Sequence, residues 1–146
     1  MIAVDTNILI YADREEMPLH ERAVSALRAL AEGPEAWALP VFCVGEFLRV
    51  VSHHRVFSPP TPVLEALESV ESLLASPTVR LLEPAEHYLP LLRHLLEESS
   101  ASGNLVFDAQ IAAVCLEHGA RTLLTEDRDF SRFAELAVQP LTSFAP

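Results

Sequence analysis

The segment Ile2-Ala3-Val4-Asp5-Thr6-Asn7 indicates the fold class of this protein. Its three apolar residues are typical of a short buried strand, and Thr6-Asn7 supply the polar groups with which a helix begins. A strand, a carboxylate and a helix are therefore expected within a few residues. Further along, Thr122-Leu123-Leu124 is another short apolar run, with Thr125-Glu126-Asp127 just past its end.

Between and around these segments, short apolar strands alternate with amphipathic helices. The expected strands cover residues 2–4, 37–39, 79–82 and 122–124, with a weaker one at 137–141. Helices are expected after Asn7 and over residues 20–32, 41–53, 63–75, 85–98 and 105–118. This alternation predicts an α/β fold with a parallel sheet covered on both faces, which binds ligands beyond the carboxyl ends of its strands.

The length and composition predict one domain, residues 1–146, since a chain of this size builds a single core. No apolar run reaches the ~18 to 20 residues of a membrane helix, and the first residues lack the pattern of a signal peptide. We therefore expect a cytoplasmic protein without membrane contact. Cys43 and Cys115 lie in apolar helical patterns and are expected to be buried free thiols.

The formal charge of −11 argues against a general nucleic-acid binder, because non-specific affinity comes mainly from basic side chains that neutralise phosphates. Any binding of RNA must therefore be local or assisted by a metal ion. The acidic residues themselves are unevenly distributed. Most of the sixteen glutamates fall on solvated helix faces, whereas four of the five aspartates fall at strand ends or inside an apolar helix. An unpaired carboxylate is costly to bury in such places.

Each of these acids has a structural interpretation beside the functional one. Asp5 could cap the first helix, and Glu46 could pair with Arg49 on its own helix. Asp108 lies in the first turn of an apolar helix, where the helix dipole favours a negative charge. Asp127 and Asp129 could be solvated loop residues or could cap a short helix. Together, however, the acids suit a hard cation such as Mg²⁺ or Mn²⁺, which prefers carboxylate oxygens.

Four motifs, in this order and spacing, jointly resemble the PIN-domain nucleases. They are Val4-Asp5-Thr6-Asn7-Ile8-Leu9, Glu46-Phe47-Leu48-Arg49-Val50-Val51, Gly103-Asn104-Leu105-Val106-Phe107-Asp108-Ala109 and Thr125-Glu126-Asp127-Arg128-Asp129-Phe130. The chain looks most like the VapC-like toxin branch of prokaryotic toxin–antitoxin pairs, and the stretch Val51-Ser52-His53-His54-Arg55-Val56-Phe57 also occurs in a subgroup of that branch.

The resemblance implies a three-layer α/β/α sandwich with a short, mostly parallel sheet. It also implies a Mg²⁺- or Mn²⁺-dependent endoribonuclease, usually a homodimer, that a small antitoxin protein inhibits. The residues that match the acidic quartet of the family are Asp5, Glu46, Asp108 and Asp127, and Asp129 matches an additional acid. The residues that match its supporting polar positions are Thr6, Asn7 and Thr125.

Other functions are compatible with parts of the pattern. The chain could be a non-catalytic interaction domain that binds a partner through its acidic face, or a housekeeping PIN nuclease without an antitoxin. A phosphatase with Asp5 as the nucleophile is a third alternative. Such enzymes typically have a second aspartate two residues further on and a lysine, whereas Asn7 stands at that position and the chain contains no lysine.

Overall fold

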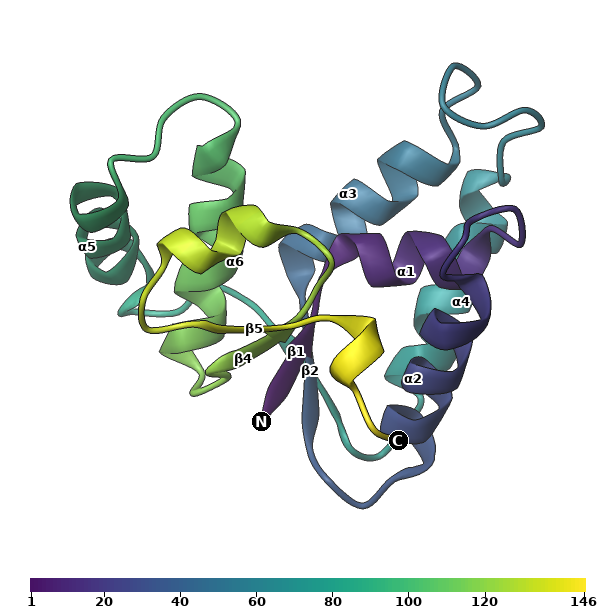
Figure 1. Ribbon diagram of the computed structural model, residues 1–146, viewed down its shortest axis with the longest axis horizontal. Coiled ribbons are helices and arrows are strands. Elements are labelled where there is room, and N and C mark those ends of the chain that lie inside the picture. The colour runs from purple at the N-terminus through teal and green to yellow at the C-terminus, as the bar shows by residue number, and fades with distance from the viewer.

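The computed structural model describes residues 1–146 and has a five-stranded sheet at its centre (Figure 1). Its strands are β1 (Ile2–Val4), β2 (Trp37–Pro40), β3 (Val79–Leu82), β4 (Thr122–Leu124) and β5 (Ala137–Gln139). They are arranged in the order β3-β2-β1-β4-β5, and every neighbouring pair is parallel. The predicted α/β fold with a parallel sheet is confirmed, including the weak last strand.

Helices cover both faces of this sheet (Figure 1). The six α-helices are α1 (Thr6–Asp13), α2 (His20–Glu32), α3 (Val41–Val51), α4 (Val63–Leu74), α5 (Tyr88–Ser99) and α6 (Leu105–Glu117). Two short 3₁₀ helices follow β4 and β5, namely η1 (Arg128–Arg132) and η2 (Leu141–Ser143). None of the α-helices has the length and apolar character that crossing a bilayer requires.

The alternation of side chains along the strands divides the core into two layers. Ala3 and Leu123 face α5 and α6, whereas their neighbours Val4 and Leu124 face α1, α2 and α4. This is the period of two that a strand imposes, and with apolar residues on both faces it produces a sheet buried on both sides. The three-layer sandwich therefore follows directly from continuous apolar strands. Helix α3 contributes to both layers, through Cys43 on one side and Phe47 on the other.

Two helix boundaries differ from the sequence prediction by two residues or more, and at both the backbone makes hydrogen bonds with residues distant in the sequence. Helix α5 begins at Tyr88 rather than at residue 85. In the turn that precedes it, the carboxylate of Glu117 accepts hydrogen bonds from the backbone N–H groups of Ala85 and His87 at 2.8 and 2.7 Å. Helix α3 ends at Val51 rather than at residue 53, because the N–H of His53 donates to the carbonyl of Val50, only three residues back, at 3.2 Å. The carbonyl of Val51 accepts from the backbone N–H of Thr61 at 2.8 Å.

Candidate active site

The predicted acids gather at the edge of the sheet where its strand order reverses. From β1 the chain proceeds outward through β2 to β3, then returns to the other side of β1 with β4 and β5. Ligands of open parallel sheets bind beyond the strand ends at such a reversal. Asp5 directly follows β1 and Thr125 directly follows β4, and the backbone N–H of Asp5 donates to the carbonyl of Leu124 at 3.1 Å.

Asp5 is held rigidly in this position by three donors. Its Oδ1 accepts from the backbone N–H of Thr6 at 2.8 Å, and its Oδ2 accepts from the Thr125 hydroxyl at 2.6 Å and from Asn7 Nδ2 at 3.1 Å. Asp5 is 4% exposed. Burial raises its pKa to about 6, against the hydrogen bonds from Thr125 and Thr6, and the charges of Glu46 and Asp127 raise it further. Asp5 is also the N-cap of α1, so its structural interpretation holds as well.

Glu46 and Asp108 come from the two helices that flank this edge. Glu46 Oε2 accepts from the Thr6 hydroxyl at 3.1 Å, and it forms no ion pair with Arg49. Asp108 lies in the first turn of α6. Its pKa is raised to about 7, first by burial and then by the charges of Asp127, Asp5, Asp129 and Glu46. The helix dipole alone therefore does not explain the environment of Asp108, in which four other acids lie close enough to raise its pKa.

The last two acids are on the loop between β4 and η1. The carboxylate oxygens of Asp108, Asp127 and Asp129 lie within 4.8 Å of one another, and Asp5 and Glu46 lie outside this compact group. Asp127 accepts from the backbone N–H of Asp129 at 2.8 Å as the N-cap of η1, and its own N–H donates to the Thr125 hydroxyl at 3.0 Å. Thr125 thus links Asp5 to the loop that carries Asp127 and Asp129.

This set of donors suits a hard divalent cation. Every predicted ligand is a carboxylate, and hydroxyl and amide groups hold those of Asp5 and Glu46 in place. The charged groups that raise the pKa of Asp5 and of Asp108 are all carboxylates, so the cluster carries repulsion that a cation would relieve. The fit is one of donor chemistry, since Mg²⁺ and Mn²⁺ prefer oxygen ligands of this kind.

Comparison with known proteins identifies the family. The family model that describes the PIN domain matches residues 2–136 of this chain. The chain belongs to the PIN-domain family. The resemblance predicted from the four sequence motifs is therefore confirmed, and this edge of the sheet is the place where the motifs of a PIN domain converge.

Curated relatives of this PIN domain are similar over nearly their whole length. The VapC ribonuclease Mb2897 of Mycobacterium bovis is 39% identical over 136 residues, which are 93% of this chain and 92% of the relative. Ribonuclease VapC43 of Mycobacterium tuberculosis has the same identity and coverage. Ribonuclease VapC31 of the same species is 34% identical over 93% of this chain and 95% of its own length.

Solved structures share the PIN fold. FitAcB from Neisseria gonorrhoeae superimposes with a TM-score of 0.69 at 23% identity, over 99% of this chain and 100% of that chain. The sarcin-ricin loop cleaving toxin VapC20 of Mycobacterium tuberculosis gives a TM-score of 0.64 at 21% identity, over 94% and 99% of the two chains. At these identities the comparison establishes the arrangement of helices and strands, and the function is argued separately below.

Two residues beside the site were not anticipated from the sequence. The pKa of Tyr11 is raised above its usual value by burial and by the charges of Glu126, Asp5 and Asp127, so its hydroxyl stays protonated. It lies four residues after Asn7 on α1, a spacing that points both side chains to the same side of a helix. Cys43 is buried, as expected for a free cysteine, and its thiol also lies 3.7 Å from Asp5 Oδ1.

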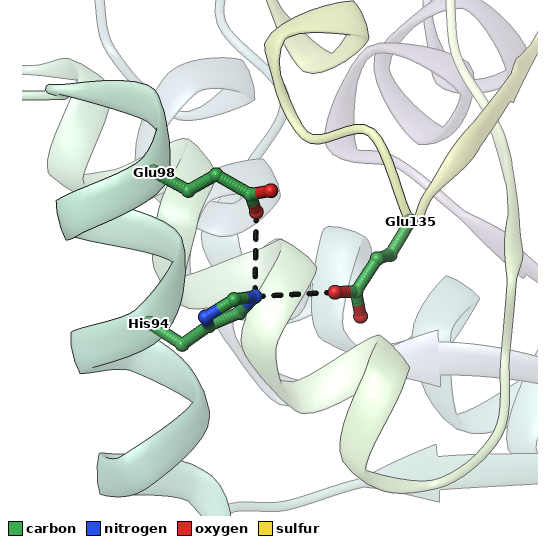
Figure 2. A group of neighbouring side chains, drawn as sticks. All are labelled: His94, Glu98 and Glu135. Carbon is green, nitrogen blue, oxygen red and sulfur yellow. Dashed lines mark hydrogen bonds and ion pairs between the residues drawn. The ribbon is translucent and has the colours of Figure 1, made fainter.

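A second group of residues that could bind a metal lies outside this edge. Figure 2 shows His94 of α5 between two carboxylates, with its Nε2 3.3 Å from Glu98 and 3.1 Å from Glu135. All three side chains are about half exposed. These contacts of His94 link α5 to the turn between η1 and β5, and they account for the arrangement without a metal ion.

Proposed function

We propose that this PIN-domain protein is a metal-dependent endoribonuclease of the VapC type, which hydrolyses phosphodiester bonds of RNA as the toxin of a toxin–antitoxin pair. The observation that carries the proposal is the convergence of five acids at the reversal point of the sheet. The names of the relatives support it, since the proteins that are 34 to 39% identical over 93% of this chain are ribonucleases.

The proposed ligands of the cation are the acids at this edge of the sheet. They are Asp5, Glu46, Asp108 and Asp127, with Asp129 as an additional ligand in the loop. We propose Mg²⁺ or Mn²⁺, because both are satisfied by carboxylates, water and the oxygens of a phosphate. A divalent ion bound there would act as a Lewis acid toward the scissile phosphate and the attacking water.

The supporting polar residues fix the directions of two of these carboxylates, those of Asp5 and Glu46. Thr125 and Asn7 hold Oδ2 of Asp5, and the Thr6 hydroxyl holds Glu46 from the neighbouring helix. Because Asn7 Nδ2 also donates to the Thr125 hydroxyl at 3.0 Å, these residues form one connected network across β1 and β4. Such a network keeps the acids close together despite their repulsion, so that the site is ready to bind a cation.

The experiment that tests the proposal is cleavage of labelled, structured RNA by the purified chain. We expect cleavage with Mg²⁺ or Mn²⁺, loss of cleavage in excess EDTA, and recovery when the divalent ion is restored. DNA of the same sequence is the matched substrate control. If the folded protein cleaves no RNA with either ion, a non-catalytic interaction domain becomes the better description.

A small antitoxin is the proposed protein partner. The structural relatives include FitAB and the VapBC2 of Rickettsia felis, each bound to a DNA fragment, and these are assemblies of this kind. We expect that expression of this chain stops bacterial growth, and that co-expression of a short reading frame adjacent to its gene restores it. Harmless expression of an active nuclease would indicate a housekeeping PIN nuclease instead.

We further propose that the protein is a homodimer that acts in the cytoplasm. Helices α4 and α5, within residues 63–96, have more hydrophobic positions than one small core needs, and Leu64 and Leu89 are each 69% exposed. The two helices lie on opposite sides of the sheet (Figure 1). In a symmetric dimer the same surface of each copy forms the interface, so the apolar surface of one of these two helices is enough to form it. Helix α5 carries an open apolar hollow at Leu89, Leu92 and Leu96, and we expect the second copy to cover it. Light scattering that finds a monomer at high micromolar concentration would contradict this.

A further inference from the structure

A hollow of about 290 Å³ lies between α3 and α6, directly beside the acidic site. Glu46 lines this hollow and also belongs to the site, through its hydrogen bond with Thr6. Phe107, on the other side of the hollow, immediately precedes Asp108. The volume is just below the range of ligand pockets, roughly 300–1,000 Å³, so the hollow suits one small, flat group.

The residues of the hollow have the chemistry that binds a nucleotide. Phe107 is 63% exposed although it is a large apolar ring, and every nucleobase has a face that can stack on such a ring. Gln110 adds an amide that can donate to and accept from the edge of a base. Arg49 is exposed and makes no ion pair, so its guanidinium is available for a phosphate. In a chain with a net charge of −11, a free cation beside the site supplies the local attraction that RNA needs.

Gly45 is an independent sign that another molecule approaches this surface. It lies inside α3, where glycine weakens a helix relative to alanine, and it lines the hollow next to Glu46. A Cβ atom added to Gly45 would meet no atom within 4 Å. Packing within the chain therefore gives no reason for glycine here. A missing side chain does make room for the close approach of a ligand.

We propose that this hollow binds the nucleotide of the RNA next to the scissile phosphate, with its base stacked on Phe107 and its phosphate bound by Arg49. The inference rests on the proposed ribonuclease function. It assigns the specificity for a particular base to α3 and α6 rather than to the acidic site, since carboxylates and a cation contact only the backbone that all RNA shares.

The decisive experiment couples Phe107 to one base of the substrate. A short RNA that spans the cut is prepared with an abasic nucleotide at each position in turn. With the wild type, we expect one position next to the cut at which the abasic RNA has a kcat/KM about 10- to 100-fold lower. With Phe107→Ala, intact and abasic RNA should be cut equally slowly, whereas Phe107→Trp should restore the difference. Leu64→Ala, on α4 and similarly exposed, is the matched control.

Gly45→Ala and Gly45→Leu test the hollow itself. Alanine should leave the Tm unchanged or raise it, because its Cβ occupies open space in a helix, while both variants should raise the KM for RNA, leucine more than alanine. Arg49→Gln should raise KM and reduce the salt dependence of binding by about one phosphate contact, and Arg22→Gln on α2 should not.

The failure of this inference is distinct from failure of the proposed function. If the wild type cuts no RNA, both are overturned. If it cuts RNA and Phe107→Ala affects no position of the abasic series, only the nucleotide site is overturned. Light scattering is recorded for every variant. A loss of activity that follows dissociation of a dimer would reassign the hollow to contact between two copies and overturn its assignment to RNA.

Discussion

The acidic site and the His94 cluster are two groups of metal-binding residues in one small protein, and they differ in how their charge is balanced. In the His94 cluster a histidine lies between two carboxylates and can itself supply the positive charge. At the end of β1 and β4, Arg132 lies 4.0 Å from Asp129, but no basic group acts on Asp5 or Asp108, whose neighbouring charges are all acids. The comparison teaches that proximity of possible ligands is a weaker sign of a metal site than uncompensated charge held in place by neutral donors.

The largest difference between the two groups is expected in catalysis. Asp5→Asn should lower the rate of RNA cleavage on the order of a thousandfold, because the substitution removes a charge at the point where the substrate and cation must meet. Glu68→Gln, which removes the same charge from the exposed face of α4, should leave the rate unchanged. Undiminished cleavage by Asp5→Asn in excess EDTA would refute the proposed mechanism.

The next difference is the pH dependence of the metal-free fold. The folded-state pKa values of Asp5 and Asp108, about 6 and about 7, exceed the usual value of 3.8, so the folded protein binds more protons than the unfolded chain between these pH values. Their contribution to stability is complete below pH 3.8 and is lost as the pH rises through 6 and 7. For Asp5 the loss is at most about 3 kcal/mol, and half-exposed Asp108 adds less because solvent screens it.

Urea unfolding in EDTA between about pH 5 and pH 7.5 measures this loss, with Asp5→Asn as the reference that removes the contribution of other groups. The free energy of unfolding of the wild type should fall relative to that of the variant as the pH rises. Saturating Mn²⁺ should reverse the trend, since a ligand of the native state adds stability in proportion to its affinity. If the difference in the free energy of unfolding between the two proteins stays constant across this range, a neighbouring group balances the charge of Asp5.

Asp108→Asn should then stabilise the metal-free fold by about 1 kcal/mol, because it removes one charge from a group of like charges. The same substitution should reduce the increase in Tm that Mn²⁺ gives the wild type. Asp13→Asn is the control, since Asp13 accepts a hydrogen bond from Thr61 at 2.7 Å and has a structural role at the end of α1. If Asp108→Asn has a lower Tm than the wild type in EDTA, and Mn²⁺ raises its Tm by as much as that of the wild type, Asp108 is a capping residue and not a metal ligand.

The smallest effect is expected at the other cluster. His94→Ala should change the free energy of unfolding by less than about 1 kcal/mol, because exposed ion pairs are weak and are screened by salt. It should not alter the stabilisation by Mn²⁺ or the rate of RNA cleavage. A clear loss of the stabilisation by Mn²⁺ in this variant would show that the His94 cluster also binds the metal ion, contrary to what its charge balance indicates.

Much of the fold could be predicted because its signals are local. Runs of apolar residues in the strands, proline and glycine at helix ends, and the apolar helix around Asp108 all act within a few neighbouring residues. At the two boundaries that differ most, partners distant in the sequence bind the backbone. Glu117 binds the N–H groups of Ala85 and His87 in the turn before α5, and no pattern near residue 85 could reveal this contact.

For the site, the sequence by itself determined which residue types stand at the strand ends, and motif order predicted the set of acids. The tertiary structure alone decided how they interact, since β4 lies beside β1 in the sheet although 118 residues separate Asn7 from Thr125. Through this pairing the hydroxyl of Thr125 reaches Asp5, and Asp127 with Asp129 reach Asp108. The hollow at Gly45 and Phe107 likewise exists only between packed helices. Chain entropy opposes such distant contacts, and only the burial of both sheet faces holds them together.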